Sequence, residues 1–301
     1  MKLINSKVEI INQEQGVDGI YKQIELAGRT AYKSEDKITP DSAKAFVDRL
    51  INAKHGAVLE HGTVYLKMPA SDLLTQIQDH TYLDYERNPY SFTNLAFEGM
   101  NEEDFSAVSS CYITTNYRVL VENGWLDDLK YICEPTEYHE KRYTFKITCD
   151  RGVSHELVRH RVFSFLQEST RFCNYSKDKF NNELTFIIPT WFEDQLPEGR
   201  YTYLDGMFWK DGEAIFNSDV HNARNLFLWG LMNDNDYYIK LINEFQLKPQ
   251  QARQILPNAL KTEVMMTGTK KQWEAFLKLR TAPDAHPDMR KIAGIIQGIL
   301  D

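Results

Sequence analysis

Apolar and polar residues alternate in some segments of the chain and recur at helical spacing in others. Alternation with a period of two predicts a strand that buries one face, whereas apolar residues three and four positions apart predict an amphipathic helix. The segments predicted as strands are 7–13, 63–69, 142–150, 184–189 and 259–267. The segments predicted as helices are 20–34, 39–56, 71–80, 151–163, 217–247, 248–256, 270–281 and 286–300.

Proline and other turn-forming residues limit these elements and fill the regions between them. Pro69 ends a predicted strand, Pro257 ends a predicted helix, and turn signals predict loops over 81–100 and 197–206. The pattern contains no internal repeat, low-complexity tract or clean linker. Strands separated by helices of varied length predict an α+β fold, with a mostly antiparallel sheet packed with helices in a single domain over 1–301.

The chain is acidic overall, which restricts the kinds of partner it can have. Its 301 residues carry 43 Asp and Glu against 35 Lys and Arg, a net charge of -8, and 42% of them are hydrophobic. A chain of this length and apolar content can bury a substantial core. Proteins that coat duplex DNA or bind anionic membranes usually present a broad basic face, so neither nucleic acid nor membrane is an expected partner. Any site for an anion must therefore be local.

The cysteines and the first residues favour a reducing, cytoplasmic location. The cysteines lie at wide spacings without C-x-x-C, which favours free thiols over a zinc ribbon or a disulfide framework. They are Cys111, Cys133, Cys149 and Cys173. The first residues lack the apolar core of a signal peptide, and no run approaches the roughly 18 apolar residues of a membrane span.

Two segments that suggest metal or phosphate chemistry fail on spacing. His155 and His160 are five positions apart rather than four, so on a helix their imidazoles would point about 140° apart and could not share a zinc ion. The Thr-Gly-Thr-Lys-Lys run from Thr267 lacks the spacing of a phosphate loop, and the chain has no G-x-G-x-x-G. We therefore expect no metal site, no Walker site and no Rossmann site.

Cationic and hydroxyl side chains gather at the C-terminal end of the predicted helix 151–163. Arg159, His160 and Arg161 are followed, after seven residues, by a Ser-Thr-Arg triplet that begins at Ser169. Hydroxyls, backbone amides and a guanidinium fork are donors that suit a phosphate, and the trio fans out widely enough to clasp a large anion. Two other interpretations fit these residues: solvated arginines that complement a helix dipole, and basic surroundings that activate Cys173 as a nucleophile.

The pattern of Arg159-His160-Arg161, seven residues, then Ser169-x-Arg171 resembles the signature of the flavin-dependent thymidylate synthases. Distant segments are similar to the same family: 59–68 resembles its histidine-bearing segment before a strand, and 252–257 with 276–280 resemble its C-terminal nucleotide-binding segments. The resemblance covers three separated parts of the chain in the family's order. It implies the family's α+β fold, with insertions.

The resemblance implies roles for individual residues. The residues implied at the flavin are His61, Arg159, His160, Arg161, Val162, Thr269 and Lys271. The residues implied at dUMP are Glu156, Gln167, Glu168, Ser169, Thr170, Arg171, Arg253 and Arg280. Of these, Arg280 is implied to touch the pyrimidine ring as the catalytic residue, and Ser169 is implied to be a phosphate ligand rather than a nucleophile.

The reaction implied by the resemblance is the reductive methylation of dUMP to dTMP. Its carbon donor is 5,10-methylenetetrahydrofolate, and its hydride comes from FAD reduced by NADPH. Because active sites in this family are assembled from several subunits, the resemblance also implies a homotetramer.

Several residues depart from the family's pattern and leave the nucleotide open. Leu166 and Gln167 stand where the family usually has Asn and Glu, and Phe172 stands for Tyr. Thr269 and Lys271 occupy positions usually held by Asn and Arg, and a lysine lacks the arginine fork. Two rivals remain: an enzyme of the same fold that methylates or hydroxymethylates another pyrimidine nucleotide, and a non-enzymatic binder of nucleotides or single-stranded nucleic acid that stacks bases on tyrosines.

Overall fold

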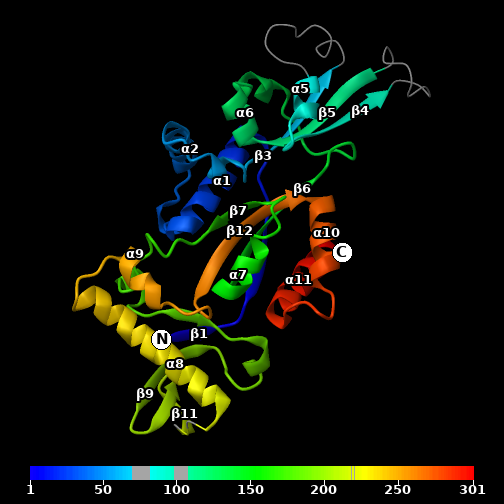
Figure 1. Cartoon of the computed structure of the whole chain (residues 1–301). Helices are drawn as coiled ribbons and strands as arrows, with labels where there is room; N and C mark the ends of the chain where they lie inside the picture. Colours follow the sequence, from blue (N-terminus) through cyan, green and yellow to red (C-terminus); the bar gives the residue numbers. More distant parts are fainter. Residues whose placement is uncertain (70–81, 98–107, 218, 220) are drawn as a thin grey trace.

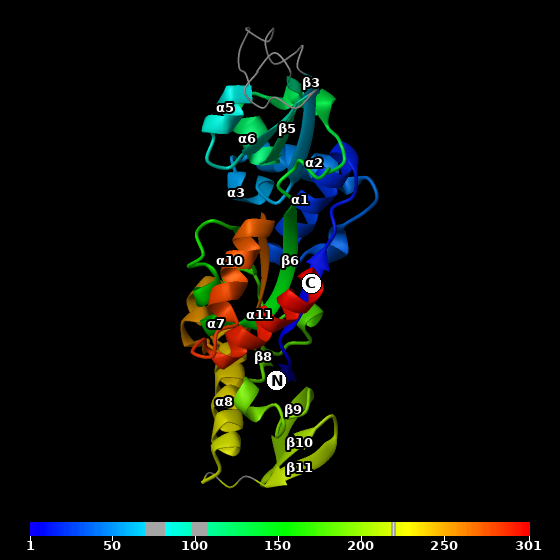
Figure 2. The same cartoon turned by 90° about the vertical axis from the view of Figure 1, so that its right-hand side faces the viewer.

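The computed structural model describes residues 1–69, 82–97, 108–217, 219 and 221–301. Three β-sheets follow one another along an elongated molecule, as Figures 1 and 2 show from two sides. The four-stranded sheet lies in the middle, the three-stranded sheet lies at one end, and the five-stranded sheet lies at the other. The predicted helix 71–80 falls outside the described residues.

The three-stranded sheet is antiparallel and belongs to the half of the chain before β6. Its order is β3–β5–β4. Its strands are β3 (Thr63–Pro69), β4 (Phe92–Phe97) and β5 (Val108–Asn116). Helices of the same half include α2 (Ser42–Asn52), α3 (Gly56–Leu59), α5 (Tyr82–Arg87) and α6 (Tyr117–Asn123). The predicted loop over 81–100 was wrong where the chain is described, because α5 buries Tyr85 completely and β4 pairs with β5.

The central sheet carries the candidate site and is antiparallel throughout. Its order is β2–β6–β12–β7. These strands are β2 (Lys7–Ile11), β6 (Arg142–Asp150), β7 (Ser164–Gln167) and β12 (Lys261–Thr269). Every residue of β12 after Lys261 is buried, so its sequence does not alternate between core and solvent as a half-buried strand would.

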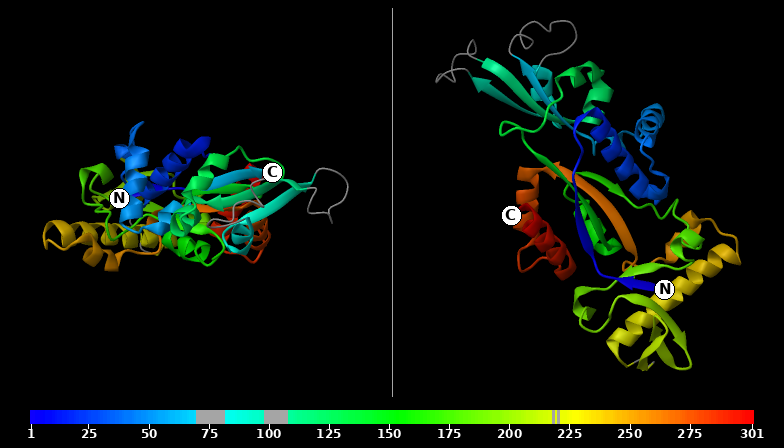
Figure 3. Two further views of the ribbon diagram at one scale, coloured as in Figure 1. Left: turned by 90° about the horizontal axis from the view of Figure 1, so that it is seen from above. Right: turned by 180° about the vertical axis from the view of Figure 1, so that it is seen from behind.

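Helices cover both faces of the central sheet (Figures 1 and 3). These helices are α1 (Gly16–Tyr32), α7 (Arg151–Leu157), α10 (Lys270–Arg280) and α11 (Pro287–Leu300). Phe145, Ile147 and Cys149 point from alternate positions of β6 into one apolar cluster with α7, α10 and α11. Helix α1 contacts β7 and β12 on the other face. We call the face covered by α7, α10 and α11 the α7 face, and the face covered by α1 the α1 face.

Helix α1 also connects the central sheet to the first half of the chain, because it packs tightly against α2. A Cβ added to Gly28 would lie 2.7 Å from ring atoms of Phe46, so the close approach of the two helices needs a glycine. Residues of α1, α2, α3, β3, β5 and α6 share one apolar core.

The five-stranded sheet has the order β11–β10–β9–β1–β8, with β1 and β8 as its parallel pair. These strands are β1 (Lys2–Ile4), β8 (Thr185–Ile187), β9 (Gly199–Leu204), β10 (Met207–Lys210) and β11 (Glu213–Asn217), and α8 (Ala223–Asn243) packs beside them. The predicted loop over 197–206 was wrong, because 199–204 is β9. Asp205 and Gly206 adopt φ of 51° and 77° and form a two-residue hairpin turn to β10, so the turn signal marked only the end of the strand.

The other predicted elements are present with shifted ends. The predicted helix 39–56 is observed as α2, which ends at Asn52, and α3 begins at Gly56. The predicted helix 151–163 ends at Leu157, and 248–256 becomes α9 (Pro249–Ala252) followed by a 3-10 turn. The described 3-10 helices are η1 (Glu35–Lys37), η3 (Leu126–Tyr131), η4 (Asp178–Phe180), η5 (Thr190–Phe192) and η6 (Arg253–Ile255). The predicted α+β class with mostly antiparallel sheets is confirmed. Of the helices described, none is both long and apolar enough to cross a membrane.

Candidate active site

Arg280 joins two of the predicted site segments on the α7 face. It is the last residue of α10, and its Nη1 donates to Glu156 Oε2 on α7 at 2.8 Å. Its Nε donates to His160 Nε2 at 2.9 Å, and its Nη2 donates to the Glu156 carbonyl oxygen at 3.4 Å. The fold therefore brings together three residues that the resemblance assigned to flavin and dUMP. We call Glu156, His160 and Arg280 the Arg280 cluster.

The Arg280 cluster has a defined protonation state. A guanidinium only donates hydrogen bonds, so Nε2 of His160 must be the acceptor, which assigns the neutral imidazole's proton to Nδ1. Burial and the neighbouring Arg280 cation lower the pKa of His160 below its ordinary value, while Glu156 opposes this. His160 is thus a neutral acceptor at neutral pH, and its ring packs edge-on against Phe276 of α10.

We call residues 159–161 the RHR turn, and a cavity of about 390 Å³ lies between Arg161 of this turn and the first half of the chain. Arg161, Val162 and Thr269, three of the residues implied at the flavin, line this cavity. Its other lining residues are Glu60, Pro89, Tyr90, Phe92, Asn116, Arg142, Phe163, Ser164 and Gln272. We call it the Arg161 cavity. It combines cations, hydroxyl and amide donors, and aromatic rings, a set that suits a flat anionic ligand.

Phe163 is held at the wall of the Arg161 cavity by a glycine. A Cβ on Gly268 would collide with the Phe163 ring, so only glycine lets the ring lie against the end of β12. Gly268 belongs to the Thr-Gly-Thr-Lys-Lys run that superficially suggests a phosphate loop. Its role in the structure is packing.

His61 is not among the described residues that line the Arg161 cavity. Its side chain is completely buried, and Nδ1 lies 2.8 Å from Thr267 Oγ1, which in turn lies 2.8 Å from Thr144 Oγ1. Burial and the nearby Arg142 lower the pKa of His61 to about 3, so the imidazole is neutral. His61 therefore supports the central sheet from inside and is not among the residues that line the cavity.

Arg159 and Lys271 also lie apart from the cavity lining. Both side chains are exposed, and Lys271 Nζ lies 3.5 Å from Glu140 Oε2. The flavin assignments thus separate into residues that line the cavity, His160 in the Arg280 cluster, buried His61, and two surface cations.

The Ser-Thr-Arg triplet lies against the α1 face. The Ser169 amide donates to the Ala31 carbonyl oxygen at the end of α1 (2.9 Å), and the Arg171 amide reaches Ser169 Oγ (3.3 Å). The Arg171 guanidinium stacks on Phe172, 5.1 Å from the ring centroid, and Phe172 contacts Tyr32. Arg171 is exposed. We call residues 168–176 the donor loop.

A second cavity of about 510 Å³ lies at the donor loop. Gln167 and Ser169 line it together with the end of α1 and the turn before α3. The Gln167 amide nitrogen donates to Ser154 Oγ at 2.9 Å and to Thr262 Oγ1 at 3.1 Å. Those bonds fix this amide where the family usually has a carboxylate.

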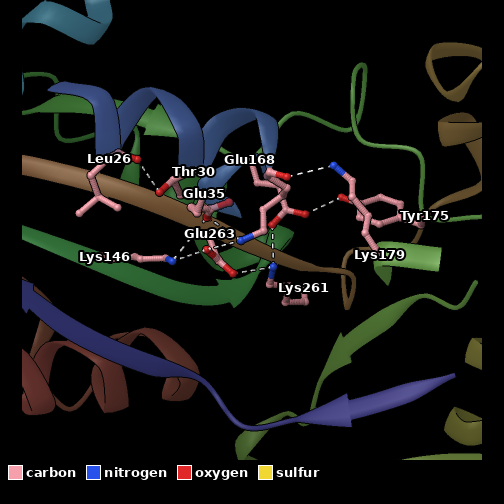
Figure 4. Close-up of polar contacts among 10 residues, drawn as sticks. Leu26, Thr30, Glu35, Lys146, Glu168, Tyr175, Lys179, Lys261 and Glu263 are labelled. Atoms are coloured by element: carbon pink, nitrogen blue, oxygen red, sulfur yellow. Dashed lines mark hydrogen bonds and ion pairs between the residues drawn. The ribbon is translucent and has the colours of Figure 1, made fainter. Parts of the chain in front are cut away.

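Glu168 is buried and lies in a charge network (Figure 4). Its Oε1 accepts from Tyr175 at 2.9 Å, and its Oε2 lies 2.7 Å from Lys261 Nζ. Thr170 is also buried, and Arg253 is exposed in η6. Both carboxylate oxygens of Glu168 thus have protein partners, which suits a residue that holds the donor loop in place.

The charge network centres on Glu263 of β12. Lys33 and Lys146 lie 2.9 and 2.8 Å from its Oε2, and Lys261 lies 2.8 Å from its Oε1 (Figure 4). Burial opposes ionisation of Glu263, but these lysines outweigh it and lower the pKa well below the usual range. With Glu35 and Glu168, these residues form the lysine–glutamate network, which joins α1, η1, β6, β12 and the donor loop.

Cys173 has the properties of a core residue. Its side chain is 1% exposed, and burial raises the pKa of its thiol to about 12. All four cysteines are free thiols. A protonated, enclosed thiol is not an effective nucleophile, so the interpretation of Cys173 as a reactive residue loses its basis.

Sequence reasoning missed Arg142, Lys261 and Glu263. Arg142 lines the Arg161 cavity, and the other two lie in the lysine–glutamate network. A charged residue directly before the apolar run 264–266 is the signal that could have identified Glu263, whereas the position of Arg142 depends on the pairing of β6 with β12. Within the described part of the chain, no three His, Cys, Asp or Glu side chains are placed to hold a metal ion.

Comparisons with known proteins agree with the sequence pattern. The sequence profile of the family "Thymidylate synthase complementing protein" matches residues 134–300. The chain is similar to the flavin-dependent thymidylate synthase of Corynebacterium efficiens, at 34% identity over 143 residues, which are 48% of this chain and 50% of that protein. It is similar to the enzyme of the same name from Aquifex aeolicus at 22% identity, over 94% of both chains. The chain thus spans about half the length of the corynebacterial relatives that it matches.

Solved structures give weaker matches. A UMP/dUMP methylase from Streptomyces cacaoi bound with 5-Br dUMP matches with a TM-score of 0.42 and 15% identity, over 100% of this chain and 92% of that one. Thymidylate synthase X from Helicobacter pylori with FAD and dUMP matches with a TM-score of 0.38 and 14% identity, over 98% and 93%.

Proposed function

Because the chain belongs to the thymidylate synthase complementing protein family, we propose that it is a flavin-dependent thymidylate synthase that methylates dUMP. The observation that carries this proposal is the Arg280 cluster. Three hydrogen bonds from one guanidinium join the end of α10 to Glu156 of α7 and to His160 of the RHR turn. Such a fixed cation suits a reaction in which negative charge develops on a pyrimidine ring.

The residues of the Arg161 cavity fit a flavin nucleotide. Arg161 is a cation for phosphate, Thr269 and Ser164 are hydroxyl donors, and Tyr90 and Phe92 offer apolar ring surface. FAD, reduced by NADPH, supplies the hydride that turns a methylene taken from 5,10-methylenetetrahydrofolate into a methyl group. His160 and Val162 would border this site, and exposed Arg159 and Lys271 would reach it only from a neighbouring subunit or after moving.

The protein's own groups would bind, orient and stabilise charge. Glu156 and His160 fix the plane of the Arg280 guanidinium, so its remaining N–H groups can face an oxygen of the pyrimidine. Ser169, Arg171 and Arg253 are proposed to hold the dUMP phosphate, with Gln167 and Thr170 nearby. Glu168 is proposed to position the donor loop, since Tyr175 and Lys261 occupy its oxygens. The proposed chemistry needs neither a metal ion nor a side-chain nucleophile.

The arrangement of these groups supports the proposed homotetramer. Arg280 contacts α7, whereas the donor loop contacts the end of α1, and these helices cover opposite faces of the central sheet (Figures 1 and 3). A nucleotide held by both groups would therefore need a second subunit. For a metabolic enzyme with four free thiols, we propose the cytoplasm as its location.

The test is turnover of dUMP with 5,10-methylenetetrahydrofolate, NADPH and FAD, with the product identified by mass. Arg280→Ala should lose dTMP formation, and Lys278→Ala, an exposed change on the same helix, should retain it. A preparation that binds FAD but leaves dUMP unmethylated under these conditions would refute the proposal.

Another pyrimidine nucleotide as substrate is the second candidate, favoured by Gln167. Its amide is fixed by Ser154 and Thr262 where the family usually has a carboxylate, so the donors and acceptors presented to the base differ. Assays with dUMP, UMP and dCMP in parallel separate the candidates, and Gln167→Glu should shift the preference toward dUMP if Gln167 reads the base.

A further inference from the structure

Arg142 is the first residue of β6, and it lies between two cavities. It pairs with Thr269 across the β6–β12 ladder, and both residues line the Arg161 cavity. Arg142 also lines a separate cavity of about 310 Å³, formed with the end of β2 and the start of α1. Its Nη1 donates to Thr63 Oγ1 and to the Thr115 carbonyl oxygen at 3.3 and 3.4 Å, and its Nη2 donates to the Glu60 carbonyl oxygen at 3.1 Å.

Among the residues that the structure describes, no carboxylate oxygen lies within ion-pair distance of Arg142, although the charge of Glu60 acts on it. The three acceptors of Arg142 are neutral oxygens, and two of its five N–H groups have no acceptor among the described residues. Glu60, the one carboxylate in the described lining of the Arg161 cavity, accepts instead from Arg118 Nη1 at 2.6 Å. Burial lowers the pKa of Arg142 to about 10. A half-buried cation with no carboxylate in direct contact is unfavourable, and a bound anion would supply that contact.

We propose that Arg142 binds a phosphoryl group of a nucleotide in the Arg161 cavity. The resemblance to the family assigns no role to this residue, and the identification of the ligand as FAD rests on the proposed function. Arg161 is the second guanidinium of the same cavity, and Ser164 and Thr269 add hydroxyl groups. Two planar guanidinium forks match the spacing of phosphate oxygens better than ammonium groups do.

The first turn of α10 is not the anion-binding element. The Thr269 hydroxyl accepts from the Gln272 amide at 3.3 Å, and the Gln272 side chain accepts from the Thr269 amide at 2.8 Å. This reciprocal capping already satisfies N–H groups that a phosphate could otherwise use. The cationic side chains therefore carry the proposal.

Thermal unfolding without and with inorganic pyrophosphate or FAD is the first test. If Arg142 binds an anion, Arg142→Gln should leave the melting temperature of the ligand-free protein unchanged or higher. The same change should abolish the rise in melting temperature that either ligand causes. Arg142→Lys should retain part of that shift. Arg290→Gln, an exposed change on α11, is the matched control and should behave as the wild type.

The second test identifies the source of the phosphoryl group. Equilibrium binding of FAD and riboflavin, and of dUMP and deoxyuridine, should show at least a tenfold loss with Arg142→Gln for one phosphorylated ligand and no change for its unphosphorylated counterpart. We expect the loss with FAD, and a loss with dUMP instead would retain the anion site and reassign its ligand.

Two results would overturn the proposal. One is a lower melting temperature of the ligand-free Arg142→Gln protein together with an intact pyrophosphate shift, which would make Arg142 a structural residue. The other is equal weakening of FAD and riboflavin. A protein that is stabilised by pyrophosphate through Arg142 but does not methylate dUMP would support this inference and refute the proposed function.

Discussion

Arg280 depends on partners that lie 120 and 124 positions away in the chain. Glu156 fixes one edge of its guanidinium and His160 fixes another, so the cation is oriented before any ligand binds. We predict that Arg280→Ala lowers kcat for dUMP methylation by about 10²–10³, the loss seen when one preorganised donor to a developing charge is removed. Arg280→Lys should lose less, because it keeps the charge but not the fork. Steady-state kinetics with dUMP varied give the values.

Arg171→Ala is the variant with which the kcat and KM of Arg280→Ala are compared. Contacts to a phosphate are the same in the ground state and the transition state, so this change should chiefly raise KM. Both variants are to be checked for flavin content and for assembly. An Arg280→Ala enzyme with normal kcat and raised KM would show that Arg280 only binds the nucleotide.

His61 gives a pH dependence whose sign follows from its burial. The unfolded chain takes up a proton near pH 6.5, whereas the folded chain does so only near pH 3, because burial and Arg142 lower the pKa. Between these values protons favour the unfolded chain, so stability falls as pH falls, by up to about 1.4 kcal/mol per pH unit. We predict that His61→Gln removes this contribution. Urea unfolding at a series of pH values should give parallel curves above pH 6.5 and a shallower decline for the variant below it; equal declines would contradict the prediction.

Individual site residues were predictable to different degrees. The family resemblance assigned Glu156, His160 and Arg280 to the site, and the structure brings them into contact, while their roles stay predictions. The sequence could not identify Arg142, because its proposed role depends on long-range strand pairing and on the lack of a carboxylate within ion-pair distance among the described residues. The assignments of His61, Arg159 and Lys271 to the flavin stay predictions, since the first is buried and the others are exposed.

Strand β12 lies between the Arg280 cluster on one face of the central sheet and the lysine–glutamate network on the other. Met266 on the α7 face shares an apolar cluster with Phe276, which contacts His160, and Glu263 on the α1 face pairs with three lysines. We predict that Glu263→Gln lowers the free energy of unfolding by about 3 kcal/mol, because removing one partner of a largely buried ion pair leaves the cations uncompensated. Chemical denaturation at neutral pH measures this change.

The control for Glu263 is Asp48→Asn, which removes an exposed ion pair to Lys44 and should change stability by less than about 1 kcal/mol. The pH dependence gives a second check. The folded pKa of Glu263 is lowered from 4.5, so its stabilisation is present above that pH and is lost as pH falls below it. The difference between the wild type and Glu263→Gln should therefore shrink below pH 4.5, and a constant difference would assign the effect to packing.

Elements with a strong period were predicted well, and those that depend on partners were not. Alternation identified β6, and helical spacing identified α10 and α11. The loop predicted over 197–206 is β9 because its pairing with β1 and β10 decides its conformation, and local turn residues mark only its end. The RHR turn was predicted at the C-terminal end of a helix because apolar spacing continues past Leu157, but the helix ends at Leu157.

At the scale of the whole molecule, three apolar cores lie along the chain, one with each sheet. Helix α1 links the central sheet to the core of the first half, and Phe186 of β8 bridges to Leu260 before β12, which links the central sheet to the five-stranded sheet. The prediction of a single domain over 1–301 stays a prediction. The opposite placement of the Arg280 cluster and the donor loop depends on this arrangement, because the central sheet separates them.

This separation predicts that two inactive variants can restore each other's activity. Arg171→Ala removes a donor-loop group and Arg280→Ala removes the cation of the other face, so each protein alone should be inactive at a dUMP concentration well below KM. If a site takes the donor loop from one subunit and the Arg280 cluster from another, co-expression of the two variants should leave about a quarter of the sites intact in randomly mixed tetramers.

Light scattering establishes the assembly, and the activity of the mixture is compared with that of each variant alone. Arg280→Ala mixed with Glu156→Ala is the control and should recover nothing, because both changes damage the same cluster. A mixed assembly of Arg171→Ala and Arg280→Ala with no recovered activity would show instead that each subunit builds its site alone.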